Sequence, residues 1–255
     1  MYDEQVRPRL LALGLGGGVQ VQRKINTFGG GESHIEEKLF DLTRRGHVPE
    51  VGITASDATI SLRIFARAAT RAECQAQIAP VEATIRDRLR HLVFGVDDED
   101  LEDAVVALLA AKKLSLASAE SVTAGRIGAK LTRVPGVSDW YRGGIIAYDN
   151  RIKVNVLGVP ARLIDTHGVI SAPVVEAMAV QCRKLFQTDI GVATVGLAGP
   201  GTGDSDKPVG LVYAAVAWDG GVKSSSFSWL GTREEIQGRT AKMALNMVRL
   251  YLLGR

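Results

Sequence analysis

The chain has little of what marks several protein classes. Cys74 and Cys182 are its only cysteines, and their separation matches no metal-ligand spacing. We therefore expect free thiols, a reducing compartment, and no bound metal or other cofactor. No apolar run approaches the roughly 18 residues needed to span a membrane. The N-terminus also lacks the basic start and apolar stretch of a signal peptide. These absences predict a soluble, cytoplasmic protein.

Charge bias and aromatic residues are scarce as well. The chain has 31 basic and 28 acidic residues, and this net charge of +3 is too small to indicate nucleic-acid binding by itself. Aromatic residues make up 5% of the chain and are sparse in its first half, where base stacking would need them. Hydrophobic residues make up 46%, enough for substantial cores in one or two domains. Nucleic acid is therefore not an expected partner.

The first third of the sequence predicts a small α+β domain. Residues 1–18 have the pattern of a helical segment followed by a glycine-rich linker, and residues 19–28 alternate as a strand does. Ser33 and Glu36 have the spacing of a capping box, so we expect a helix from Ser33 that stops at Gly46. The residues expected on its inward face are Ile35, Leu39 and Leu42.

Two strands and a long helix complete this domain in the sequence. The strands are expected at residues 51–54 and 59–66. The helix is expected at residues 71–93, despite Pro80, because apolar residues recur along one face. The order strand, helix, two strands, helix suits a two-layer, KH-like α+β domain over residues 19–96.

The remaining residues, 97–255, predict a second domain. The acidic run at residues 96–100 is expected to be a solvated linker at the boundary, in preference to a metal site. Helical and strand-like segments then alternate, which is typical of an α/β domain with layered helices and a mixed sheet. The expected helices cover residues 101–112, 124–133, a segment from about 160, a segment after 171, and 233–253. The expected strands cover residues 114–119, 143–147, 190–197 and 211–218.

Ser121 is the strongest candidate for a reacting side chain. It lies between an expected strand and an expected helix, in the segment 119–125. A hydroxyl at such a junction lies near unpaired backbone N–H groups and the positive end of the helix dipole. These groups can stabilise an alkoxide or hold an anionic substrate. The alternative is that Ser121 or Thr123 simply caps the helix.

Lys153 is the candidate base for this serine. A lysine can serve if burial or a neighbouring cation lowers its pKa from about 10.4 towards 7–8. The sequence offers no Ser-His-Asp pattern, because His167 is the only histidine in the second half and is expected in a loop. No Gly-x-Ser-x-Gly elbow surrounds Ser121. The alternative for Lys153 is an ordinary solvated surface lysine.

Two further features suit an anionic ligand. The glycine-rich segment 196–203 could form a backbone concavity for phosphate, although it is not a Walker loop. Arg233 begins the expected last helix, and arginine suits bidentate phosphate recognition. The alternatives are a plain connection between two strands and a solvated arginine.

Five motifs that occur in order give the sequence a family resemblance. They are Ala119-Glu120-Ser121-Val122-Thr123, the Tyr-x-Asn-x-x-Lys segment 148–153, Leu157-Gly158-Val159, Gly196-Leu197-Ala198-Gly199-Pro200 and Lys207-Pro208-Val209-Gly210. Together they resemble the C-terminal domain of the CinA family (competence/damage-inducible protein), the nicotinamide-nucleotide amidohydrolase or NMN deamidase. Residues 23–33 resemble the KH-like middle domain of that family. Residues 1–10 look like the tail of its N-terminal domain, which is otherwise missing from this chain.

The resemblance implies an activity and a set of site residues. The activity is hydrolysis of the carboxamide of nicotinamide mononucleotide to nicotinic acid mononucleotide and ammonia, a step of pyridine-nucleotide recycling. Ser121 would be the nucleophile, Lys153 its general base, and Tyr148 would position the base or the substrate. The implied substrate contacts are Glu120, Thr123, Gly125, Asn150, Gly196, Gly199 and Arg233. We also expect a homodimer or higher homo-oligomer, in which the KH-like domain is structural.

Four positions depart from the family pattern. Val122 and Ala124 stand where the family usually has cysteine and glycine, and Gln237 stands where it tends to have arginine. Val195 stands where the family has threonine or serine, so a hydroxyl is absent. These departures leave open a catalytically weakened, nucleotide-binding or regulatory relative. A third alternative is an RNA-associated adaptor that uses the first domain.

Overall fold

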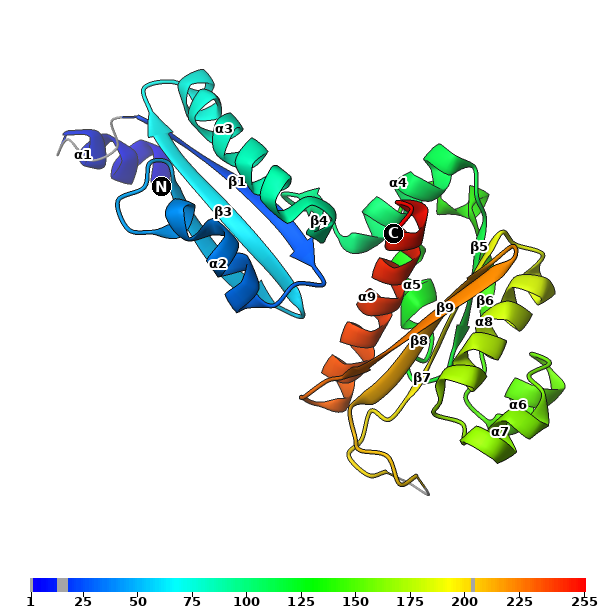
Figure 1. Ribbon diagram of the computed structural model, residues 1–255. Coiled ribbons are helices and arrows are strands. Elements are labelled where there is room, and N and C mark those ends of the chain that lie inside the picture. The colour runs from blue at the N-terminus through cyan, green and yellow to red at the C-terminus, as the bar shows by residue number, and fades with distance from the viewer. Residues whose placement is uncertain (1, 13–17, 203–204) are drawn as a thin grey trace. The chain divides into compact units, whose positions relative to one another are not determined.

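The computed structural model describes residues 2–12, 18–202 and 205–255. The chain forms two compact units, Met1–Glu99 and Asp100–Arg255, each with its own sheet (Figure 1). Residues 2–12 are helical, as η1 (Tyr2–Val6) and α1 (Arg7–Ala12). The glycine-rich linker expected before residue 19 lies largely outside the described residues.

The first unit is a four-stranded sheet with two helices packed into one core. Its strands are β1 (Val19–Phe28), β2 (Glu50–Ser56), β3 (Thr59–Ala68) and β4 (Val93–Val96), in the antiparallel order β2-β3-β1-β4. Every second residue of β3 is buried, and these residues share a core with α2 (Glu32–Thr43) and α3 (Arg71–Leu89). One sheet face therefore carries both helices. The expected two-layer α+β fold is confirmed.

Three details of the first unit correct the sequence predictions. Gly31 is the N-cap of α2 and makes no side-chain cap, so the capping box expected at Ser33 is wrong. The helix ends at Thr43, before Gly46. The long helix α3 ends at Leu89 because Arg90 has a φ of +47°, which no α-helix accommodates. A short 3-10 turn, η2 (Arg90–Leu92), and then β4 follow. The helix predicted to end at residue 93 is therefore four residues too long, and β4 was not predicted.

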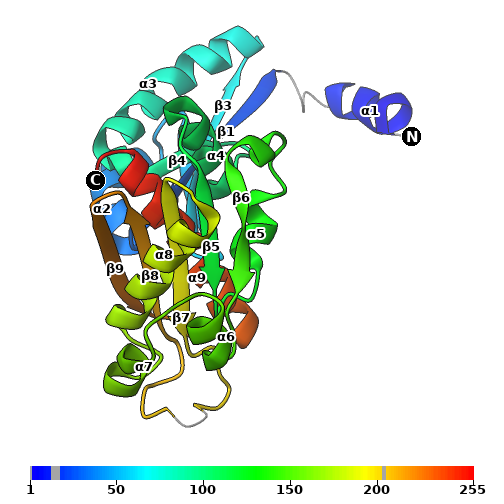
Figure 2. The same cartoon turned by 90° about the vertical axis from the view of Figure 1, so that its right-hand side faces the viewer.

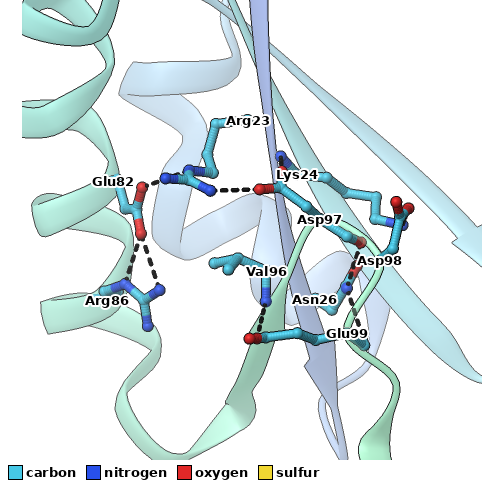
Figure 3. A network of polar contacts seen from close by, with 9 residues as sticks. All are labelled: Arg23, Lys24, Asn26, Glu82, Arg86, Val96, Asp97, Asp98 and Glu99. Atoms are coloured by element: carbon cyan, nitrogen blue, oxygen red, sulfur yellow. Dashed lines mark hydrogen bonds and ion pairs between the residues drawn. The ribbon is translucent and has the colours of Figure 1, made fainter. Parts of the chain in front are cut away.

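The acidic run after β4 is bound to β1 and is not a solvated linker (Figure 3). The Asp97 carboxylate accepts hydrogen bonds from the Arg23 guanidinium and, at 3.1 Å, from the backbone N–H of Lys24. The Asn26 amide donates to the backbone oxygens of Asp97 and Glu99, at 3.1 and 3.0 Å. Residues 97–99 therefore complete the first unit, and the boundary expected at residue 97 moves three residues onward.

The second unit is a five-stranded mixed sheet between two helical layers. Its strands are β5 (Leu116–Glu120), β6 (Tyr141–Ile146), β7 (Ile190–Gly196), β8 (Leu211–Trp218) and β9 (Gly221–Ser228). The order is β6-β5-β7-β8-β9. Strand β5 pairs in parallel with β6 and β7, whereas β8 pairs antiparallel with both β7 and β9. This confirms the α/β class and the mixed sheet.

The helices divide between the two faces of this sheet. Helix α8 (Ala172–Phe186) packs on one face, and α9 (Arg233–Leu252) lies on the other with α4 (Leu101–Lys112) and α5 (Arg126–Leu131) (Figures 1 and 2). The α8 face is formed by small residues such as Ala117, Ala193 and Ala215, which allow close approach. A Cβ on Gly191 would lie 2.2 Å from the Ala179 carbonyl oxygen, so only glycine fits there.

Four elements of the second unit differ from expectation. Helix α6 (Asn150–Asn155) and strand β9 were not predicted, nor was the 3-10 turn η3 (Val137–Asp139). His167 was expected in a loop but is the last residue of α7 (Ala161–His167). None of the helices in the described part of the chain combines the length and apolarity that crossing a membrane requires.

The connections after β5 and β6 open a crevice at one edge of the sheet. From β5 the chain passes through α5, on the α9 side, to reach β6. From β6 it returns through α8, on the opposite face, to β7, which lies on the other side of β5. Connections that leave neighbouring parallel strands towards opposite faces create a crevice at the carboxyl ends, where α/β proteins bind ligands.

Candidate active site

A cavity of about 280 Å³ lies at this switch point, at the carboxyl ends of β5 and β7. Segments that are far apart in sequence converge on it: the turn after β5, helix α6, the loop after β7 and the start of α9. The structure thus brings together most of the predicted site residues. Those that line the cavity are Ser121, Tyr148, Asn150, Lys153, Gly196, Gly199 and Arg233.

Three predicted substrate contacts do not line the cavity: Glu120, Thr123 and Gly125. The Glu120 side chain is buried, and its carboxylate accepts hydrogen bonds from the backbone N–H groups of Gly125, Ile127 and Gly128, at 2.9 to 3.0 Å. These are the unpaired N–H groups at the start of α5 that were expected to face a substrate. Glu120 therefore holds the turn that carries Ser121, and its carboxylate is directed at these N–H groups.

Thr123 and Gly125 also serve the turn. The Thr123 hydroxyl is fully buried and lies 2.8 Å from the hydroxyl of Thr194 on β7. Gly125 has a φ of +93°, and Ala124 before it has a φ of +50°. An alanine in the left-handed conformation is strained by about 1–2 kcal/mol, which explains why glycine would suit position 124 better. The methyl group of Ala124 is thus accommodated through backbone strain.

We expect Glu120→Gln to destabilise the protein by about 2–4 kcal/mol, because an amide can accept fewer of the three N–H groups and presents its own N–H to one of them. Turnover per folded molecule should also fall, because the Ser121 turn loosens. Glu102→Gln is the matched control: Glu102 is equally buried but pairs with Lys130, at 3.3 Å. Denaturant unfolding and active-fraction assays measure both effects. Unchanged turnover per folded Glu120→Gln molecule would contradict the positioning role.

Lys153 is almost completely buried, with 1% of its surface exposed, so it is no solvated surface lysine. It lies on α6, whose N-cap Asp149 accepts a hydrogen bond from the Arg151 N–H at 2.7 Å. The Lys153 ammonium donates to the Tyr148 carbonyl oxygen at 2.8 Å. Burial lowers the pKa of Lys153 to about 8, and the Asp149 carboxylate opposes this shift. About a tenth of Lys153 is therefore neutral at pH 7 and about half at pH 8.

Tyr148 and Arg233 join the two sides of the cavity. The Arg233 guanidinium donates to the Tyr148 hydroxyl at 2.9 Å and to the Gly199 carbonyl oxygen at 2.6 Å. Tyr148 thus contacts the base through its backbone and the arginine through its side chain. Arg233 begins α9, whose Thr232 and Glu235 form a full capping box. The guanidinium is held by these contacts against the loop after β7.

Sequence reasoning missed two apolar residues that line the cavity and one glutamine that supports the Ser121 turn. Val169 and Ile170, between α7 and α8, line it, although nothing in their local sequence marks a site. Gln237, at a position that departs from the family pattern, is buried on α9 and donates to the Val122 carbonyl oxygen at 3.0 Å. It therefore supports the residue that follows Ser121.

Val195 faces the cavity from β7 and is 1% exposed. Its neighbour Thr194 points to the opposite face of the strand, where its hydroxyl meets Thr123. The Thr194 hydroxyl therefore cannot replace the one missing at Val195. The part of the chain that the structure describes also holds no group of three or more His, Cys, Asp or Glu side chains suited to a metal ion.

Comparison with known families accounts for both units. A family model described as the CinA C-terminal domain matches residues 98–252, and one described as the damage-inducible protein CinA KH domain matches residues 22–95. The chain belongs to the CinA family. The KH match lies within the first compact unit, and the C-terminal match begins two residues before the second unit and contains the candidate site.

Individual relatives agree with this assignment. A CinA-like protein of Parasynechococcus marenigrum is 39% identical over 257 residues, which cover 100% of this chain and 61% of the relative. The chain therefore spans about three fifths of the length of the curated relatives it matches. The crystal structure of a CinA superfamily protein from Klebsiella pneumoniae superposes with a TM-score of 0.59 at 26% identity, over 62% of this chain and all of that one. The crystal structure of the competence/damage inducible protein CihA from Agrobacterium tumefaciens superposes with a TM-score of 0.57 at 32% identity, over 61% of this chain and 94% of that one.

Proposed function

We propose that this CinA protein hydrolyses the carboxamide of nicotinamide mononucleotide to nicotinic acid mononucleotide and ammonia. The observation that carries the proposal is a buried lysine, with a pKa lowered to about 8, in the same cavity as a serine at a strand-to-helix turn and an arginine at a helix start. Such a lysine can accept a proton near neutral pH, which an ordinary surface lysine does not.

In the first half of the reaction, Ser121 Oγ attacks the carboxamide carbon while neutral Lys153 takes the hydroxyl proton. The resulting tetrahedral oxyanion collapses as the C–N bond breaks. Lys153 returns its proton to the departing nitrogen, and ammonia leaves. The product is an ester between Ser121 and the nicotinoyl group.

In the second half, water attacks the ester and Lys153 takes one of its protons. The C–O bond to Ser121 breaks, the serine recovers a proton from Lys153, and the carboxylic acid leaves as its carboxylate. One amide bond and one water are consumed, and one ammonia and one acid are released. The chemistry uses no electron transfer.

The oxyanion requires hydrogen-bond donors, and several backbone N–H groups near Ser121 are already bonded to other acceptors. The Ser121 N–H donates to the Thr194 carbonyl oxygen at 3.1 Å, and Glu120 occupies three N–H groups of α5. Val122 and Ala198 line the cavity, and their backbone N–H groups have no partner within the described residues. We assign these two N–H groups as the oxyanion donors.

The other end of the cavity suits the phosphate. The Arg233 guanidinium has five N–H donors and retains some of them beyond its contacts with Tyr148 and Gly199. The backbone of the Gly196–Gly199 segment lies beside it. The apolar wall of Val169 and Ile170 suits the face of the pyridine ring.

Val195 favours a second candidate function, a nucleotide-binding relative with little turnover. An apolar side chain stands where the family has a hydroxyl, while the other side chains of the cavity are present. Binding of the mononucleotide without ammonia release would distinguish this candidate from the enzyme.

The proposal is tested by incubating purified protein with nicotinamide mononucleotide and measuring ammonia, with and without a chelator. We expect ammonia release that the chelator leaves unchanged, and slower release from nicotinamide riboside, which lacks the phosphate. Calorimetric titration of the mononucleotide accompanies the assay. Binding without release supports the second candidate, whereas neither binding nor release overturns both.

The pH dependence of the rate provides an internal check on Lys153. Only the neutral amine can act as a base, so kcat/KM should rise with pH and level off above about pH 8, because burial lowers the pKa of Lys153 to about 8. A lysine with the ordinary pKa of 10.5 would keep the rate rising beyond pH 10. Initial rates of ammonia release between pH 6 and pH 10.5 measure this profile.

Asp149→Asn is the matched variant for this profile. Asparagine keeps the N-cap of α6 but removes the carboxylate that raises the pKa of Lys153. The rising limb should therefore move to lower pH while the plateau rate is retained. A limb that stays in place, or moves to higher pH, would show that Lys153 does not set the profile.

A further inference from the structure

Lys207 contacts the wall of the cavity without lining it. Its ammonium donates a hydrogen bond to the backbone carbonyl oxygen of Ile170, 37 residues earlier in the chain. It also lies 5.8 Å from the centre of the Tyr213 ring, within the range of a cation–π contact. Lys207 is half-buried. The first part of the Lys207-Pro208-Val209-Gly210 motif is thus tied to a segment between α7 and α8.

The same motif also supports the glycine loop that lines the cavity. The Gly210 N–H donates to the Leu197 carbonyl oxygen at 2.8 Å. A Cβ built on Gly199 would lie 2.6 Å from Val209, so the loop packs directly on this side chain. Leu197 and Gly199 both line the cavity. One four-residue motif therefore contacts two segments that line the cavity, one before α8 and one after β7.

We propose that Lys207 is a positioning residue that fixes the width of the cavity by tying the Val169–Ile170 wall to the glycine loop. The wall is a short connection between α7 and α8, and its Ile170 side chain is buried. Gly168 ends α7 with a φ of +73°, and the Ser171 hydroxyl donates back to the Gly168 carbonyl oxygen at 2.8 Å. These bonds close the turn on itself, whereas the Lys207 bond links it to β8 and its loop.

The proposed role predicts an effect on binding more than on chemistry. Lys207 does not line the cavity, whereas Ser121 and Lys153 do, and the Lys207 ammonium is bound to the Ile170 carbonyl oxygen. Loss of the tether lets the apolar wall move, so the aromatic ring of a bound mononucleotide loses its packing surface. This kinetic consequence rests on the proposed deamidase function, while the tether itself does not.

Hydrogen exchange followed by mass spectrometry tests the tether in the full chain. In Lys207→Met, which keeps the apolar stem, amides in residues 167–175 should exchange about tenfold faster than in the wild type. Lys207→Arg, which keeps a charged donor, should stay close to the wild type, and Lys207→Gln, a milder variant, should fall between. Lys223→Met, which removes an exposed lysine from β9, is the control and should change nothing in this segment. Unchanged exchange in folded Lys207→Met and Lys207→Gln would overturn the tether.

Kinetics then test the positioning role. KM for nicotinamide mononucleotide should rise about tenfold in Lys207→Met with kcat changed less than about threefold, and Lys207→Arg should restore most of the loss. Faster exchange with an unchanged KM would overturn the positioning role. A wild type that releases no ammonia would overturn the proposed function instead, and the exchange comparison would still decide whether Lys207 is a tether.

Discussion

Replacement of Ser121 by alanine is expected to lower kcat for ammonia release by at least about 10³-fold, because no ester can form without the hydroxyl. The Ser121 backbone bonds to Thr194 and Ala124 do not involve the side chain, so the fold should persist. Single-turnover ammonia release and denaturant unfolding measure the two properties on the same sample. Retained turnover in a folded Ser121→Ala variant would remove Ser121 from the mechanism.

Lys153→Met should lose activity to a similar degree but should gain stability. Burial lowers the pKa of Lys153 to about 8, so below that pH the folded protein holds a charge that is more favourable in the unfolded chain. Removing it should raise the free energy of unfolding at pH 7 by about 1–3 kcal/mol. The sign follows from linkage: the unfolded lysine binds its proton more tightly. The gain should therefore shrink as pH rises from about 8 towards 10.5, where both states become neutral.

The double variant tests whether the two residues act as one unit. If Lys153 serves only to activate Ser121, then Ser121→Ala combined with Lys153→Met should be little slower than either single variant. Losses that multiply would argue for two independent contributions. A Lys153→Met variant with less stability than the wild type at pH 7 would contradict the assigned pKa shift, whatever its rate.

Val195→Thr should raise kcat at least severalfold. Valine and threonine have nearly the same shape, and Val195 lines the cavity, so the new hydroxyl would enter the site with little steric strain. A hydroxyl that stabilises the oxyanion or orients Lys153 contributes a factor on the order of 10² to 10³ in kcat. The natural protein should then be a slow deamidase, since the Thr194 hydroxyl is directed to the other face of β7.

The cost of burying a hydroxyl must be separated from its catalytic effect. Val192 lies on the same strand, is fully buried and lies outside the cavity lining, so Val192→Thr is the matched control. Both variants should lose roughly 1–3 kcal/mol of stability if the hydroxyl finds no partner, but only Val195→Thr should gain rate. Steady-state kinetics on both decide the point. Equal or lower turnover in folded Val195→Thr would show that the valine is no defect.

The elements that sequence patterns predicted are those whose signals are local. Helix α8 follows its N-cap Ser171, has Pro173 in its first turn and buries a helical stripe, while β7 and β8 are largely apolar runs. The strand-to-helix turn around Ser121 is visible for the same reason. The family resemblance then identified many of the residues that line the cavity, but not Val169 and Ile170.

The elements that escaped prediction depend on partners far away in sequence. Strand β9 is an edge strand rich in serine, and only its antiparallel pairing with β8 fixes it as a strand. Glu120 resembles a site carboxylate until the fold places three backbone N–H groups around it. The burial of Lys153 is equally invisible, because packing around the short helix α6 causes it. Long-range packing decides each of these cases.

The bonds between β1 and residues 97–99 determine where the polypeptide can be divided. A piece ending at Val96 would leave the buried Asn26 amide without the two backbone acceptors it uses and Arg23 without one of its carboxylates. Asp100, by contrast, caps α4 together with Asp103 and belongs to the following half. If the two units are expressed separately, the chain should therefore be divided between Glu99 and Asp100. This leaves each set of hydrogen bonds intact.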